Sequence, residues 1–553
     1  MHNGVWQKRG GGLLLGVGVV LLAASTVRGE ELTPEELRAR LDRVEKLNQE
    51  LLKRLEALES GGNTGSPVIL QGKEAEGTVP GLDKDAVKKI VGDYLKTEDE
   101  KKKKKEEEKK KEEAEQWYEV GKDLGMTARW NNGLHVETKD KAFRIHPTGR
   151  FQWDLVWMTA PDNVMFGRGG VGDVLDASAF RRARVGVEGT MWEVINFHFE
   201  PDFFNTLNVL TPGTTPQQAT STHPVPIDNW IEVAKLPIIG NVRMGSVKPE
   251  YSIEHLTSSR NLDFLERSLI GDAYIVGLDN GFQPGFVVYN SWCDDRIRVA
   301  SSITKNNENI FGFNVGDGEW NYVLRVTGLP VYEHEGRCLV HVGGSVCHKD
   351  LDQDQYRFRS RTTLRNGPAA LQTRLTDIVL FGNSMDMVLP EFAVTWGPFN
   401  MFVEYAGVWT NGVTVANNAF LPPVQNFPGR TVFYQGFNVE ALYFLTGENR
   451  GYNKKMAFFD RPKVLTNFFR VKTDEGICTG WGAWQVGVRY SWTDFNDAGI
   501  NGGIAQDWTL GVNWFLCPTF KIQANYVINR RDIAGLPSNG YIQGFGIRTA
   551  WDF

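Results

Sequence analysis

A short segment in the second half of the chain carries four arginines that share one parity. These arginines are Arg357, Arg359, Arg361 and Arg365. Because side chains on a β-strand alternate between two faces, the four guanidinium groups are expected to lie on one face, about 7 Å from rung to rung. The other face would carry Tyr356, Phe358 and Leu364 and is expected to meet lipid. We call the four arginines the arginine ladder.

An arginine ladder must face water, because an arginine that faces the middle of a bilayer costs about 2–4 kcal/mol. A guanidinium group stays charged at any accessible pH and presents a planar fork of donors that fits phosphate or carboxylate. A row of such groups on a pore wall is therefore predicted to guide anions. The alternative is that the segment is a basic extracellular loop that contacts lipopolysaccharide.

A shorter pattern of the same kind occurs at Arg182 and Arg184, which alternate with Ala183 and Val185. These two arginines are further candidates for anion binding in a polar lumen. The alternative is that they pair with acidic lumen residues such as Glu188.

Other chemistries find little support in the sequence. It has no Gly-x-Ser-x-Gly, His-Glu-x-x-His or phosphate-loop motif, so we expect neither an enzyme nor a nucleotide or metal cofactor. His341 and His348 are seven residues apart and would lie on opposite faces of a strand, which does not suit a metal site. The formal net charge of -6 does not suggest nucleic acid binding, and any preference for anions must arise locally.

The end of the chain indicates which elements would hold these side chains. In the last stretch Phe545, Ile547, Thr549, Trp551 and Phe553 alternate with Gly546, Arg548, Ala550 and Asp552. Similar alternation occurs over 508–516 and 520–529. An aromatic, apolar face opposite a small or polar face is typical of a strand in an outer-membrane barrel. The alternative is a soluble sandwich in which the apolar face is buried.

Four regions with other patterns precede this alternation. Residues 1–29 combine a basic start, an apolar run and small residues, which predicts a cleaved signal peptide, with a membrane anchor helix as the alternative. Residues 30–60 carry a heptad seam of about three repeats and predict a short coiled coil, or one amphipathic helix on a neighbour.

Two further segments lie before the alternating part. Residues 61–83 predict a linker that is rich in Gly, Pro and small polar residues. Residues 84–142 predict a Lys/Glu-rich segment, helical or partly disordered, in the periplasm. A mixed charge run of this kind is usually solvated, and the alternative is contact with anionic lipid or the cell wall.

The remaining residues 143–553 predict an all-β domain, a transmembrane antiparallel β-barrel. At about 25 residues for each strand with its share of turn and loop, the segment holds about 16 strands. An even number returns the C-terminus to the periplasmic side. A tight turn at Cys517–Thr519 and a longer loop over Arg530–Gly540 fit the final hairpin.

Five cysteines are present. We expect Cys478 and Cys517 at the same periplasmic rim, next to strands that a long loop over Thr493–Asp507 joins at the other end. The sequence leaves open whether these two form a disulfide or stay free thiols. Cys338 and Cys347 are expected on one strand, too far apart to bridge.

The alternating part resembles the phosphate-selective porin O and P family over roughly residues 145–553. The resemblance rests on Phe180–Gly189, Leu256–Arg260 with Phe264–Arg267, Leu445–Glu448, Gly482–Val486 and Trp508–Trp514. It implies a 16-stranded, trimeric outer-membrane channel for phosphate or related anions, with an arginine ladder on the pore wall. It also implies a cationic residue on an inward-folded loop. Arg260 takes that position, where the family pattern has lysine.

Together these observations predict a porin for passive diffusion of small anions, phosphate or polyphosphate-like oxyanions in particular, in the outer membrane with its N-terminal region in the periplasm. Outer-membrane lipid and two further copies of the chain are the expected partners. One alternative is a general diffusion porin without solute preference. Another is a protein that tethers the outer membrane to peptidoglycan through its N-terminal helices.

Overall fold

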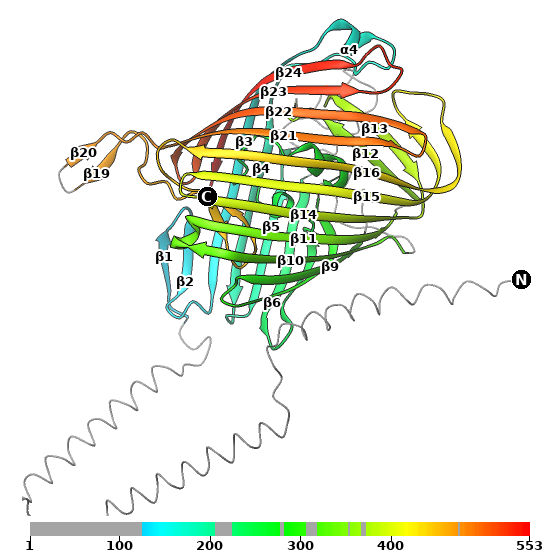
Figure 1. Cartoon of the computed structure of the whole chain (residues 1–553). Helices are drawn as coiled ribbons and strands as arrows, with labels where there is room; N and C mark the ends of the chain where they lie inside the picture. Colours follow the sequence, from blue (N-terminus) through cyan, green and yellow to red (C-terminus); the bar gives the residue numbers. More distant parts are fainter. Residues whose placement is uncertain are drawn as a thin grey trace, which may run out of the picture. The chain divides into compact units, whose positions relative to one another are not determined.

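The computed structural model describes residues 124–204, 224–276, 281–305, 318–351, 354–365, 372–473 and 476–553. Its main feature is a closed barrel of antiparallel strands (Figure 1). In chain order the barrel strands are β3 (Arg144–Thr159), β4 (Ala177–Met191), β5 (Ile195–Asp202), β6 (Val225–Leu236), β7 (Gly240–Val247), β8 (Gln283–Trp292), β9 (Ile297–Lys305), β10 (Trp320–Glu333), β11 (Cys338–Asp350), β14 (Ser384–Trp396), β15 (Phe399–Asn418), β16 (Gln425–Phe444), β21 (Ala483–Asp497), β22 (Ile500–Cys517), β23 (Phe520–Asp532) and β24 (Gly540–Asp552).

The barrel closes where its last strand pairs with its first. β24 runs antiparallel to β3, with Trp551 opposite Phe151 and Phe545 opposite Trp157. Closure satisfies the backbone hydrogen bonds of both strands, which lipid could not do. The sequence prediction of a transmembrane antiparallel barrel of about 16 strands is therefore confirmed.

Alternation along the strands separates an outer from an inner face. Trp508 is 50% exposed and Leu510 54%, whereas Thr509 between them is 1% exposed. On β24 Phe545 and Trp551 are exposed and Arg548 is fully buried inside. The large apolar side chains thus point outward and the polar ones inward, which excludes the soluble sandwich.

Turns and loops follow the predicted order at the final hairpin. β22 and β23 are joined by a short turn at Pro518 and Thr519, and β23 and β24 by the longer loop 533–539. The prediction of a long loop over Thr493–Asp507 is wrong. β21 continues to Asp497 and β22 starts at Ile500, because Ala498 (φ 52°) and Gly499 (φ 80°) form a two-residue turn in the left-handed region.

The N-terminal predictions fall largely outside the described residues. The signal peptide, coiled coil and linker lie there entirely, and so does most of segment 84–142. The described end of that segment is not helical. It forms a hairpin of β1 (Met126–Trp130) and β2 (Leu134–Thr138), whose turn contains Asn132 at φ 55°. Asn131, Asn132 and Gly133 favour a turn over a continuing helix.

The five cysteines carry free thiols. Cys478 lies on β20 (Gly476–Cys478) and Cys517 at the end of β22. Of the two alternatives for this pair, the structure shows free thiols and no disulfide. Cys338 and Cys347 lie on β11, as expected. None of the helices in the described ranges is long and apolar enough to cross a membrane.

Candidate functional site

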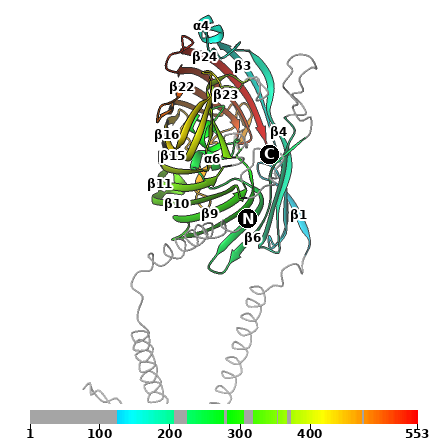
Figure 2. The ribbon, with the colours of Figure 1, turned by 90° about the vertical axis from the view of Figure 1, so that its right-hand side faces the viewer.

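The segment between β7 and β8 has the described residues 248–276 and 281–282, which we call the inward loop, and residues 253–276 of it run across the inside of the barrel. It contains α6 (Ile253–Leu256) and η1 (Gly271–Val276). In Figure 2 α6 lies between the wall of β11, β15 and β16 and the wall of β3 and β4. The carbonyl of Leu262 accepts from Lys521 Nζ (2.8 Å), and that of Glu266 accepts from Arg489 Nη1 (2.7 Å). The loop is therefore fixed to the opposite wall, at β23 and β21.

Two other segments also enter the barrel. The first follows β11 and contains β12 (Gln355–Arg361) and β13 (Arg374–Phe381). The second is the insertion between β16 and β21. Its hairpin of β17 (Gly451–Asn453) and β18 (Phe458–Asp460) enters the barrel, whereas the following hairpin of β19 (Val471–Thr473) and β20 projects away from it (Figure 1). Phe459 N donates to Thr257 Oγ1 (3.2 Å), and Asn261 Nδ2 donates to Asp460 Oδ1 (3.0 Å). The β17–β18 hairpin thus contacts the inward loop.

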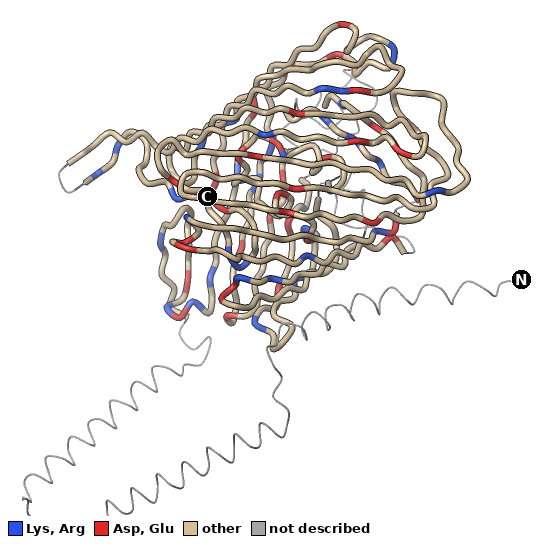
Figure 3. The backbone as a smooth tube through the Cα atoms, in the orientation of Figure 1, with Lys and Arg blue, Asp and Glu red and all other residues tan. Residues whose placement is uncertain are grey.

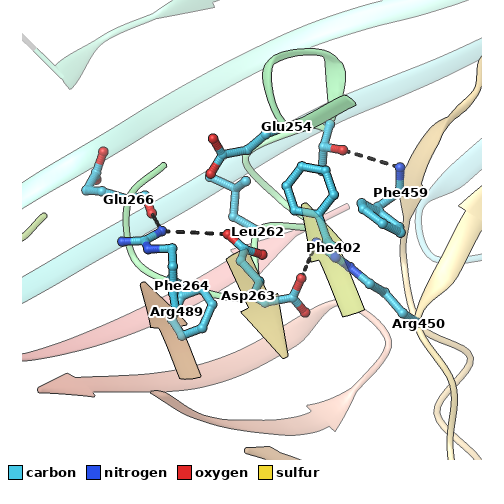
Figure 4. A pocket seen from close by; sticks show the side chains of 11 residues that line it. Glu254, Leu262, Asp263, Phe264, Glu266, Phe402, Arg450, Phe459 and Arg489 are labelled. Carbon is cyan, nitrogen blue, oxygen red and sulfur yellow. Dashed lines mark hydrogen bonds and ion pairs between the residues drawn. The ribbon is translucent and has the colours of Figure 1, made fainter. Parts of the chain in front are cut away.

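On one side the inward loop packs against the wall, where Glu254 N donates to Glu404 of β15 and Tyr274 Oη donates to the carbonyl of Gln435 of β16. Figure 4 shows the small pocket that remains there, with Asp263 facing Arg450 and Arg489 reaching Glu266. The guanidinium of Arg450 also lies 3.4 Å from the centroid of the Phe459 ring. The pocket has a volume of about 10 Å³, which is room for about one water molecule.

On the other side lies a much larger cavity of about 430 Å³. Strands β3 to β7, the inward loop and the two other inward segments line it. Its cationic side chains are Arg150, Arg181, Arg182, Arg184, Arg243, Lys248, Arg260, Arg267, Arg361 and Arg365. Its acidic side chains are Glu188, Asp202, Asp228, Glu250, Glu266 and Asp272. Cations exceed carboxylates by four, although the whole chain is acidic. Figure 3 shows the two signs interspersed through the barrel.

Three arginines of the cavity converge on one carboxylate, Glu200. Its oxygens accept from Arg150 Nη2 (2.8 Å), Arg184 Nη1 (3.3 Å) and Arg260 Nη2 (2.9 Å). Arg150 also donates to Ser259 Oγ (2.6 Å). The cluster joins β3, β4 and β5 to the inward loop and keeps more guanidinium than carboxylate charge at one point.

A second cluster surrounds Asp272 of η1. Its carboxylate accepts from Arg361 Nε (3.1 Å) and pairs with Arg365 Nη2 (3.1 Å). Burial alone would raise the pKa of Asp272, but the guanidinium groups of Arg361 and Arg365 more than offset burial and hold the pKa below its ordinary value. Asp272 therefore stays ionised and partly neutralises both arginines.

The cavity brings together five of the seven arginines that the sequence singled out. Arg182, Arg184, Arg260, Arg361 and Arg365 line it. The cavity lining does not include the other two. Arg357 lies on β12 and forms a bidentate pair with Asp377 on β13, and Arg359 lies two residues further along the strand.

The prediction that the apolar face of the segment 356–365 meets lipid is wrong. Phe358 and Leu364 are fully buried in the protein and do not meet lipid, and Tyr356 is 8% exposed. Phe358 packs against Tyr434 of β16 and Phe495 of β21, from inside the barrel. The parity of the segment is as expected, but the strand lies inside the barrel and its apolar face packs on the inner wall.

Sequence reasoning missed Arg150 and four other cations of the cavity, and it missed the carboxylates that pair with the predicted arginines. Glu188, the carboxylate that it named, instead contacts His146 and His198. Parity could have found Arg150, because it shares the inward face of β3 with Gln152 and Asp154, opposite Phe151 and Trp153. His341 and His348 lie on opposite faces of β11, as expected: the first is fully buried and the second is about half exposed. Within the described ranges, no group of three or more His, Cys, Asp or Glu side chains could hold a metal ion.

Comparison with known proteins agrees with this architecture. Porin O of Pseudomonas aeruginosa is 24% identical over 428 residues, which cover 72% of this chain and 86% of that protein. An uncharacterized protein of Caulobacter vibrioides is 25% identical over 409 residues, which cover 72% of this chain and 70% of that protein.

Two solved structures align with low identity and a TM-score below 0.5. OmpF of Salmonella typhi aligns with 13% identity and a TM-score of 0.43, over 77% of this chain and 100% of its own. An anion-selective porin from Comamonas acidovorans aligns with 10% identity and a TM-score of 0.41, over 74% of this chain and 100% of its own.

The model of the phosphate-selective porin O and P family matches residues 147–552 of this chain. The chain belongs to this family.

Proposed function

We propose that the cavity conducts small oxyanions, phosphate or polyphosphate-like anions in particular, by passive diffusion across the outer membrane. The observation that carries the proposal is the excess of four cations among the charged side chains of the cavity, in a chain whose net charge is -6. The small pocket on the other side of the inward loop offers room for about one water. A solute that enters this cavity meets these arginines.

The arrangement of the arginines suits passage more than permanent binding. An anion would exchange part of its water shell for guanidinium contacts in the Glu200 cluster and in the Asp272 cluster. Each cluster already holds a carboxylate, which competes with the anion and weakens each site. Several moderate sites let an ion enter and leave, whereas one deep site would trap it.

Arg361 and Arg365 are the part of the predicted arginine ladder that this mechanism uses. Arg182, Arg184 and Arg260 extend the basic surface, and Arg150 joins it. Arg357 is engaged by Asp377 and is assigned a supporting role in the β12–β13 hairpin.

Membership of the family also indicates where the protein lies and how it assembles. As a porin the chain lies in the outer membrane, with lipid against its aromatic outer face. We further propose a homotrimer with the N-terminal region in the periplasm, on the strength of the resemblance and of the even strand number. The tether to peptidoglycan has no observation in the described residues that favours it over the channel.

The test compares Arg260→Gln with wild type in planar bilayers. The exposed fraction of the Arg260 side chain is 17%, more than that of Arg150 or Arg184, so its loss should disturb folding least. Reversal potentials in phosphate and in chloride gradients should show anion selectivity in wild type and less of it in the variant. Arg530→Gln, at an exposed pair outside the cavity, is the control with the same charge change. A wild-type channel without anion selectivity would refute the proposal and leave a general diffusion porin.

A further inference from the structure

Apolar side chains line part of the same basic cavity. Besides Phe180 of β4 and the buried Ile227 of β6, there are six: Phe204, Trp230, Leu256, Phe282, Met456 and Phe458. They come from four separate places: the end of β5, β6, the inward loop and the β17–β18 insertion. All six are only partly buried. The cavity therefore presents apolar and aromatic surface as well as guanidinium groups.

Two of the aromatic rings carry cations next to their faces. The guanidinium carbon of Arg243 lies 3.8 Å from the centroid of the Trp230 ring, and Lys248 Nζ lies 5.5 Å from that of Phe282. The His198 ring is stacked at 5.6 Å from the Trp230 ring. These contacts fix ring and charge side by side, so that one ligand could touch both.

An inorganic ion gives this apolar surface no partner. Phosphate needs charge and several donors, whereas a Phe ring supplies neither and a Trp ring supplies only its single indole N–H. A volume of about 430 Å³ falls in the range of sites for organic ligands, roughly 300–1,000 Å³. Such sites combine an apolar lining with a few polar groups that fix orientation. Both parts are present here.

We propose that the preferred solutes of the channel are organic oxyanions: a phosphate, phosphonate or carboxylate group joined to an apolar, typically aromatic, group. This inference rests on the proposed anion function of the same cavity. The oxyanion head binds the arginines of the Glu200 cluster and of the Asp272 cluster. The apolar group packs on Trp230, Phe282 and Phe458 while the solute passes.

The experiment compares phenylphosphate with inorganic phosphate as blockers of chloride current through the full-length protein. A mildly alkaline pH gives both anions two charges, so they differ mainly in the ring. Burial of part of a phenyl ring should make phenylphosphate block half of the current at a concentration about 5- to 30-fold lower than phosphate. Equal blocking concentrations in wild type would overturn the inference and leave the proposed anion function intact. Block by neither anion, in a channel without anion selectivity, would instead refute the proposed function.

Substitutions then identify the apolar surface. Phe458→Ala should bring the two blocking concentrations to within about twofold of each other, and Phe458→Leu should restore part of the difference. Phe469→Ala is the matched control, because Phe469 belongs to the same insertion but is 59% exposed and does not line the cavity. A full preference for phenylphosphate in both Phe458→Ala and Trp230→Ala would overturn the assignment.

Discussion

Asp272 and Arg361 lie on two different segments that fold into the barrel, and they form an ion pair inside it. Arg361 Nε is 3.1 Å from Asp272 Oδ1, and the backbone N–H of Arg361 donates to Oδ2 (2.9 Å). Arg365 pairs with the same carboxylate. One acidic side chain of the inward loop therefore holds the segment that carries the arginine ladder.

Asp272→Asn should loosen this junction. The substitution leaves two buried guanidinium groups without their shared counter-charge, and breaking a buried pair costs about 3–5 kcal/mol. We expect a lower melting temperature in detergent by circular dichroism and larger fluctuations of the open-channel current. Asp532→Asn, at the exposed pair with Arg530 (3.2 Å), should change either quantity little. An unchanged melting temperature in Asp272→Asn would contradict the structural role of the pair.

The same pair predicts a dependence on pH. Because the folded-state pKa of Asp272 lies below its ordinary value, its stabilisation is fully present above the ordinary carboxyl pKa of about 4 and is lost as pH falls through the folded pKa. The difference in melting temperature between wild type and Asp272→Asn should therefore be constant near neutral pH and shrink below about pH 4. A difference that grows on acidification would show that another group is responsible.

The sequence predicts the barrel well because parity determines which face a wall residue takes. Trp508 and Thr509 are assigned to the outside and the inside by alternation alone, and the structure agrees. Parity cannot tell a wall strand from a strand that lies inside the barrel. The alternation around Phe358 would look the same on a wall strand and on a strand inside the barrel. The sequence therefore places the segment 356–365 in the wall, whereas in the structure β12 packs against the inner side of the wall.

The acidic partners are harder to predict for a related reason. Glu200 is contacted by Arg150, Arg184 and Arg260, which lie 16 to 60 positions away along the chain. Asp272 and Arg361 are 89 positions apart. No local pattern relates such residues, since the loop that brings them together crosses the barrel and its path depends on the opposite wall.

The arginines of the ladder should differ in their effect on conduction. Arg361 and Arg365 line the cavity, whereas Arg357 is bound in both branches of its fork by Asp377. Arg361→Gln and Arg365→Gln should each lower phosphate conductance by about three- to tenfold, since contacts to a charged donor are lost. Arg357→Gln should change it by less than about twofold. Single-channel currents in potassium phosphate measure this, and an equal loss in all three variants would favour a continuous ladder.

Glu200→Gln should make the Glu200 cluster bind anions more tightly. The amide keeps an oxygen that accepts from the arginines but removes the negative charge that competes with phosphate. Phosphate conductance should saturate at a concentration about tenfold lower, with a smaller maximal current, because tighter binding slows exit. Glu335→Gln, an exposed residue in the short helix between β10 and β11, is the charge-matched control. Saturation at the wild-type concentration in Glu200→Gln would show that Glu200 does not tune the site.

The inward course of the segment after β12 can be tested through a glycine on the facing wall. A Cβ atom at Gly546 of β24 would lie 2.7 Å from Leu364 Cδ2 and 3.0 Å from Leu265 Cδ2, so Gly546→Ala crowds both inward segments. Overpacking of this kind costs about 1–3 kcal/mol. The cost should appear as a lower melting temperature together with altered current fluctuations. At Gly328 of β10 the nearest atom would be 3.7 Å away, so Gly328→Ala should be neutral. If both alanine variants behave alike, Leu364 does not pack against β24 and the segment takes another path.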